Sequence, residues 1–288
     1  MNINHFFYFD ENRNFGDTVN KLFFQKLINS KLNFLTRDNH NLFLHYFTTG
    51  SILSFVNENS IVYGSGFISE TSNLGSPLYS KANTINTVYN KPLQFISVRG
   101  PKTRAKLLSM GVDCPENYGD PLILFPLIYT KNIYPSVKYG IIPHYVDKTS
   151  NNLMTLLNNL GSDCKIIDII IPDLNYKYFI NQILDCEYII SSSLHGVIMG
   201  IIYKKKTIFV QFGKKVIGDQ FKFFDFFESL DIKYQVKNVY SKELLENTIT
   251  VDYDKLYRLV KNMINIAPFI DSTSKPILIK KYKTYLFQ

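Results

Sequence analysis

Short apolar runs alternate with helical segments along the chain, and this alternation constrains the fold more than any other feature. The repeated order of strand and helix is typical of βα units, which build parallel sheets. In the first part of the chain we expect strands at 5–9, 60–63 and 93–98 and a helix at 17–28. A second helix should start at Pro101 and end near a cap at Gly111.

The same order returns after a proline-punctuated stretch, Phe125–Pro135, which we interpret as a linker. The expected strands there are 138–143, 165–171, 188–190 and 207–210, and the expected helices are 151–160, 176–184, 194–202 and 252–266. We therefore predict an α/β protein with two Rossmann-like domains, 1–130 and 135–250, and a cleft between them. Residues 251–288 should form a helical segment that packs back on the body. Ligands of such sheets bind at the carboxyl ends of the strands.

Composition and charge restrict the class of partner. Of the 288 residues, 45% are hydrophobic and 19% charged, as expected for a buried globular core. No apolar run is long enough to span a bilayer, no signal peptide is evident, and three scattered cysteines suit a reducing cytoplasm. The net charge of +8 indicates an anionic partner. The lysines are spread along the chain and are not clustered on one helix, as a nucleic-acid-binding surface would require. We expect a cytoplasmic protein without a metal or a nucleic-acid partner.

The strongest local signal is the junction Ser191–Gly196, where a strand ends in three serines and a helix begins near His195. Free backbone N–H groups and the positive end of the helix dipole favour an anion at such a place. A histidine there is suited to proton transfer near neutral pH. The alternative is that the serines only cap the helix and that His195 is an ordinary packed residue.

Further motifs, in order along the chain, give the sequence a resemblance to a known family. They are Asn14–Asp17, Gly64–Gly66, Val98–Thr103, Tyr118–Pro121, the Ser-Leu-His-Gly junction and Lys222–Phe227. Together they resemble the polysaccharide pyruvyl transferase family. The resemblance implies a GT-B-like pair of Rossmann-like domains, with the acceptor on the N-terminal side and the donor on the C-terminal side. It implies transfer of pyruvate as a ketal from phosphoenolpyruvate, with no cofactor, to hydroxyls of a bacterial surface-polysaccharide precursor, as in capsule or exopolysaccharide biosynthesis.

The resemblance also implies roles for single residues. His195 would be the general acid that protonates the methylene carbon of phosphoenolpyruvate, and Arg99 would bind the donor's carboxylate or phosphate. The other donor-side residues would be Ser191, Ser192, Ser193, Leu194 and Gly196, together with Lys214, Lys215 and Lys222. The acceptor-side residues would be Asn14, Gly16, Asp17, Gly64, Ser65, Gly66 and Asp120. Simpler roles stay open: a salt bridge for Arg99, a helix N-cap for Asp17, and plain turns for Gly64, Gly66 and Asp120.

One departure concerns the donor. Many family members carry an arginine where this chain has Ser193, so Lys214, Lys215, Lys222 or backbone N–H groups would have to hold the phosphate. Two other functions therefore remain open: a GT-B-type glycosyltransferase with a nucleotide-sugar donor, and a catalytically silent glycan-binding relative.

The C-terminal segment, residues 277–287, mixes lysines with apolar and aromatic side chains. It either packs on the protein body, which we favour, or touches the cytoplasmic membrane face, where lipid-linked oligosaccharide acceptors are found.

Overall fold

The strands form two parallel sheets. The protein is described by a computed structural model that covers residues 4–9, 14–75, 90–171 and 175–288. The first sheet has the strand order β2-β1-β3-β4-β5 and the second the order β7-β6-β8-β9. The strands of the first sheet are β1 (His5–Phe7), β2 (Asn33–Leu35), β3 (His45–Phe47), β4 (Ser60–Tyr63) and β5 (Gln94–Ser97). Those of the second are β6 (Val137–Ile142), β7 (Cys164–Ile166), β8 (Cys186–Ser191) and β9 (Lys206–Phe209). All pairings in both sheets are parallel, which confirms the predicted α/β class with parallel sheets.

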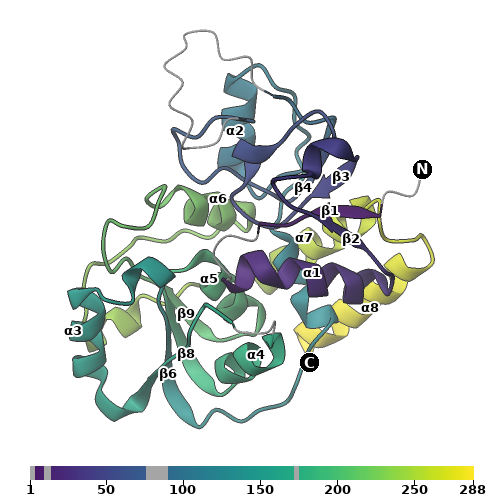
Figure 1. Cartoon of the computed structure of the whole chain (residues 1–288). Helices are drawn as coiled ribbons and strands as arrows, with labels where there is room; N and C mark the ends of the chain where they lie inside the picture. Colours follow the sequence, from purple (N-terminus) through teal and green to yellow (C-terminus); the bar gives the residue numbers. More distant parts are fainter. Residues whose placement is uncertain (1–3, 10–13, 76–89, 172–174) are drawn as a thin grey trace.

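Helices cover these sheets and also lie between them (Figure 1). They are α1 (Phe15–Ile28), α2 (Pro101–Ser109), α3 (Asn151–Leu160), α4 (Tyr176–Leu184), α5 (Leu194–Ile202), α6 (Phe221–Ser229), α7 (Tyr253–Ile266) and α8 (Ser274–Phe287). In α1, Phe24 packs on Phe6 of the first sheet, whereas Phe15 stacks on Phe179 of α4. One hydrophobic core thus runs through both parts of the chain. A division into two domains in a GT-B-like arrangement, with the boundaries given above, stays a prediction.

Local sequence explains how α1 is placed. Asn14 is its N-cap, with its side-chain oxygen accepting a hydrogen bond from Asp17 N, and Asn29 ends the helix in the left-handed conformation. The alternative role of Asp17 as the N-cap is therefore wrong. The N-terminus of α1 also joins the second part of the chain, because Phe15 N donates to Ile169 O at 2.7 Å.

Two expected elements differ from the structure. The first residues of the predicted linker belong to a buried 3₁₀ helix, η3 (Pro121–Leu127). The apolar side chains of η3 pack into the core beneath α5 and α8, so this part of the chain is not a linker. The strand expected at 165–171 ends at Ile166. Asp168 then accepts a hydrogen bond from Ile170 N, and the chain turns toward α1.

The last two helices lie on the body. Tyr63 of β4 donates a hydrogen bond to Met263 O in α7, and Tyr282 of α8 donates one to Ile123 O in η3. Ile277 and Phe287 of α8 remain exposed. Among the described residues, no helix combines the length and apolar character required to cross a membrane. Contact of α8 with a membrane surface stays a prediction.

Candidate functional site

A cavity of about 180 Å³ lies where the N-terminal ends of α1, α5 and α6 meet. Both parts of the chain contribute to it. Its polar and charged lining residues are Asn14, Asp17, Arg37, Ser51, Ser54, His144, Ser193, His195 and Lys222. Its apolar and aromatic lining includes Phe9, Ile52, Phe55, Ile68, Tyr145, Ile169, Leu194 and Ile217.

The junction of β8 and α5 supplies the predicted histidine. Ser193 is the N-cap residue of α5, but its side chain makes no capping hydrogen bond. Ser193, Leu194 and His195 all line the cavity, so the first turn of α5 borders it. The N-terminus of a helix favours an anion, and an anion site at this junction stays a prediction.

Three neighbours of this turn are not at the cavity surface. Ser191 Oγ donates to Ile142 O and accepts from Ser193 N, and Ser192 Oγ donates to Asp147 Oδ2. A methyl group on Gly196 would lie 2.9 Å from Ile142 Cγ2, so glycine lets α5 pack closely on β6. The expectation that Ser191, Ser192 and Gly196 contact the donor conflicts with these contacts, which shape the junction instead.

His195 lies between Asp120 and Gly16. Its Nε2 is 3.8 Å from Asp120 Oδ2, and both atoms are buried without a hydrogen-bond partner. The other carboxylate oxygen of Asp120 accepts from Leu122 N at 3.0 Å and begins η3. A methyl group on Gly16 would overlap the imidazole Nδ1. Asp120 thus accepts a hydrogen bond from a turn N–H group, which is the simpler of the two roles left open. It also faces His195, a contact that the sequence did not predict.

Asp17 lines the cavity from α1. Asn14 Nδ2 donates a hydrogen bond to Asp17 Oδ2. Burial raises the pKa of Asp17 to about 6, an effect that His195, Asn14 and Lys222 partly oppose. The carboxyl group is therefore half protonated near pH 6 and mostly ionised at pH 7.

Of the three candidate lysines, only Lys222 lines the cavity. Its side chain is buried, and burial, followed by the charge of Arg99, lowers its pKa to about 8. Lys214 and Lys215 are exposed and lie outside the cavity lining. Donor binding by these two lysines stays a prediction.

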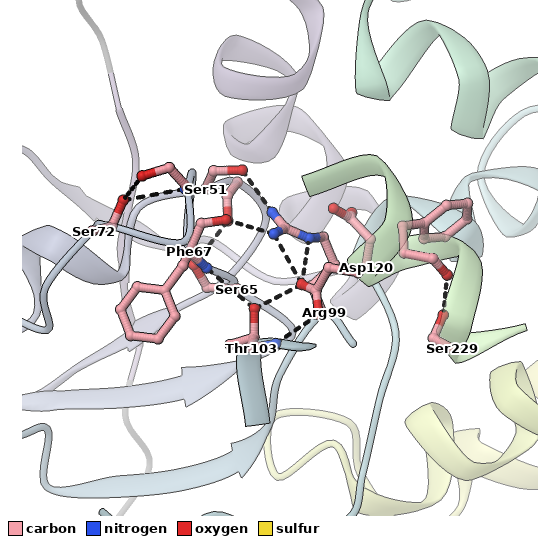
Figure 2. Close-up of polar contacts among 12 residues, drawn as sticks. Ser51, Ser65, Phe67, Ser72, Arg99, Thr103, Asp120 and Ser229 are labelled. Atoms are coloured by element: carbon pink, nitrogen blue, oxygen red, sulfur yellow. Dashed lines mark hydrogen bonds and ion pairs between the residues drawn. The ribbon is translucent and has the colours of Figure 1, made fainter. Parts of the chain in front are cut away.

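Arg99 is fully buried and lies behind the cavity rather than in its wall. Its Nε donates to Asp225 Oδ2 at 2.9 Å, and its two terminal nitrogens donate to Ser51 Oγ and Phe67 O, both at 2.6 Å (Figure 2). Thr103 also donates to the carboxylate of Asp225, through N and Oγ1. Direct binding of the donor by Arg99 is thus inconsistent with the structure, because protein groups already hold the guanidinium. The simpler alternative, a salt bridge, is what the structure shows.

The Gly-Ser-Gly motif surrounds this buried arginine. Gly64 has φ +83°, and a methyl group there would lie 2.6 Å from Gly119 O. Ser65 Oγ donates to Gly50 O, and a methyl group on Gly66 would lie 2.5 Å from Arg99 Cζ. None of the three lines the cavity. The three residues have a packing role here, and their contact with an acceptor stays a prediction.

The family model for polysaccharide pyruvyl transferases matches residues 16–211. This chain belongs to that family. The match includes Gly16, Asp17, Asp120 and His195 and ends before Lys222. A relative is the uncharacterized protein L143 of Acanthamoeba polyphaga mimivirus, which is 31% identical over 260 residues, 86% of this chain and 84% of that protein. No solved structure matches the chain.

Two basic side chains of the cavity in this pyruvyl transferase family member, His144 and Arg37, were not predicted from the sequence. His144 and Arg37 each lie two positions after the end of a strand, β6 and β2 respectively. Burial, with the charges of Lys222 and His195, lowers the pKa of His144 to about 3, so its imidazole is neutral at physiological pH. The signal that could have found both residues is their position at the carboxyl end of a parallel strand.

No group of three or more His, Cys, Asp or Glu side chains within the described ranges could hold a metal ion. Catalysis without a metal stays a prediction.

Proposed function

We propose that the protein transfers a pyruvyl group from phosphoenolpyruvate to two hydroxyls of a sugar, forming a ketal and releasing phosphate. The observation that carries the proposal is the position of His195. In a member of this family, it lines a small cavity at the N-terminus of α5, beside the buried cation of Lys222. The proposal is not restricted to a bacterial polysaccharide, because a relative comes from a virus.

The size of the cavity supports a small donor. About 180 Å³ is below the roughly 300–1,000 Å³ of pockets that bind drug-sized ligands. A three-carbon phosphate ester suits this space better than a nucleotide sugar. The acceptor sugar would then bind at the mouth of the cavity.

The donor's charge would be held by Lys222 and by the N–H groups of the first turn of α5. An anion gains from both the helix dipole and a buried cation. This pair would take the place of the arginine that other family members carry at the position of Ser193. Neutral His144 would add a hydrogen bond rather than a charge.

His195 would protonate the methylene carbon of the donor as a sugar hydroxyl attacks C2. Asp120 would act through His195, because its carboxylate faces Nε2 and would hold the imidazole in one orientation. The 3.8 Å separation would shorten once the donor is bound, since catalytic hydrogen bonds are often long without substrate.

A phosphate-release assay tests the proposed function. The purified protein is incubated with phosphoenolpyruvate and a panel of glycans, lipid-linked and free, with UDP-sugars in parallel. Phosphate release that requires a glycan supports the proposal. Consumption of a nucleotide sugar without phosphate release from phosphoenolpyruvate would favour a glycosyltransferase, and binding of glycan without turnover would favour a silent relative.

Replacing Asp120 with asparagine should lower kcat on the order of 10²-fold or more while leaving the affinity for phosphoenolpyruvate unchanged. Asparagine keeps the oxygen that accepts from Leu122 N and replaces the charged oxygen that faces His195 with an uncharged NH2 group. Asp120→Ala, which also removes the turn hydrogen bond, serves as the comparison for stability. An Asp120→Asn variant with wild-type kcat would show that the carboxylate does not assist His195.

Replacing Lys222 with glutamine should weaken binding of phosphoenolpyruvate at least about tenfold at pH 7. Because the pKa of Lys222 is about 8, the wild-type protein should also lose affinity as the pH rises above 8 and the ammonium loses its proton. Calorimetric titration measures both effects. Lys214→Gln, which removes an exposed lysine, is the control and should bind normally. Equal affinities of the two variants would remove Lys222 from the donor site.

A further inference from the structure

We propose that Asp17 is a second catalytic proton carrier, which takes the proton from the attacking sugar hydroxyl while His195 delivers a proton to the donor. This inference rests on the proposed function. It names a base for the step in which the acceptor oxygen forms its bond to C2.

The geometry places Asp17 and His195 on two different elements at one cavity. Asp17 projects from the first turn of α1, and His195 from the first turn of α5. Gly16 packs directly against the imidazole ring, so the turn that carries Asp17 is held beside His195. A donor bound at the N-terminus of α5 and an acceptor oxygen approaching from α1 would meet between these two groups.

The Asp17 side chain does not cap α1. The helix is capped by Asn14, and the Asp17 carboxylate receives a hydrogen bond from the Asn14 amide. This contact fixes the orientation of the carboxylate without neutralising its charge. Asp17 forms no ion pair with a lysine or arginine within the described residues.

The groups that face Asp17 favour its ionised form, which is the form that can act as a base. They are the imidazole of His195 on α5 and the ammonium of Lys222 on α6, with the neutral amide of Asn14 on its own helix. With a pKa of about 6, Asp17 is mostly ionised at pH 7 and still binds a proton more readily than an exposed aspartate. A base whose pKa lies near the working pH is efficient in proton transfer.

The protons balance over the full reaction. In the first step, the hydroxyl oxygen bonds to C2, its proton passes to Asp17, and His195 gives a proton to C3, which becomes a methyl group. In the second step, the bond from C2 to the phosphate oxygen breaks, and the phosphate leaves with the electron pair and takes the proton from Asp17. The second hydroxyl then bonds to C2 and gives its proton to His195. Both groups return to their starting states, and the products are the ketal and phosphate.

The test is the pH dependence of kcat/KM in Asp17→Asn, measured by phosphate release with phosphoenolpyruvate and an acceptor. Wild type should lose activity as the pH falls through about 6, because protonated Asp17 cannot accept a proton. Asp17→Asn should be slower by about 10²–10⁴-fold, lack this decline, and bind phosphoenolpyruvate as wild type does. Formate should partly restore Asp17→Ala, since it can enter the space left by the side chain.

The control is Asp254→Asn, which replaces another first-turn aspartate, in α7, away from the cavity. It should match wild type in rate and pH profile. If Asp17→Asn is slowed equally at every pH and keeps the decline near pH 6, Asp17 acts only through His195 and the inference is wrong. Activity within threefold of wild type would also overturn it. If wild type releases no phosphate with any acceptor, the proposed function itself fails, and the role of Asp17 with it.

Discussion

Replacing Asp225 with alanine is expected to lower the free energy of unfolding by about 3–5 kcal/mol, the usual effect of breaking a buried ion pair. Arg99 would keep its charge in a fully buried position without its carboxylate partner. Thr103 would also lose the acceptor for its N–H and hydroxyl groups. Urea denaturation followed by circular dichroism measures the loss.

The chain offers a matched control close to this ion pair, between α2 and α6. Lys102 of α2 and Glu228 of α6 form an exposed ion pair, with 38% and 45% of their side chains accessible. Glu228→Gln should change stability by less than about 1 kcal/mol, because water already screens these charges. A double variant, Arg99→Met with Asp225→Leu, should recover much of the loss. If Asp225→Ala is as stable as Glu228→Gln, the buried ion pair does not hold α6 against the first sheet.

Replacing Gly16 with alanine is expected to lower kcat/KM on the order of 10³-fold or more while the protein stays folded. The added methyl group would overlap the imidazole of His195, which then must leave its position beside Asp120. A misplacement of about 1 Å in a catalytic group can cost 10²-fold, and this overlap requires a larger shift. Alanine also suits a helix better than glycine by about 0.5–1 kcal/mol, so the backbone of α1 should tolerate the change.

Gly213→Ala is the control for this variant. Gly213 is exposed, and an added methyl group would have its nearest neighbour at an ordinary 3.8 Å, from Asp147 Oδ1. It should keep wild-type kinetics. A Gly16→Ala variant with near-normal activity would mean that the imidazole need not occupy the place between Gly16 and Asp120.

The sequence predicted best the helices whose apolar residues recur at helical spacing over at least two turns. The bounds expected for α3, α4 and α5 agree with the structure, and α4 begins after the capping side chain of Asn175. β2 and β3 were missed because three residues are too few to show a period. No prediction was made for α6, although its hydrophobic residues recur at helical spacing.

The candidate site was predicted only in part, because its contacts join residues far apart in the sequence. A helix start after a strand is a local pattern, so His195 could be found from its neighbours. The partner of a charged residue is not local: Arg99 and Asp225 are 126 positions apart. Sequence could therefore suggest an arginine at a helix start, but not that a buried carboxylate already holds it.

The most direct test of pyruvyl transfer is the mass of the glycan after incubation with phosphoenolpyruvate, for wild type and for His195→Asn. The proposed function predicts a gain equal to pyruvate minus water in the wild-type reaction, one phosphate released per glycan modified, and neither product with His195→Asn. An unchanged glycan mass across the acceptor panel, or the same gain with His195→Asn, would contradict it.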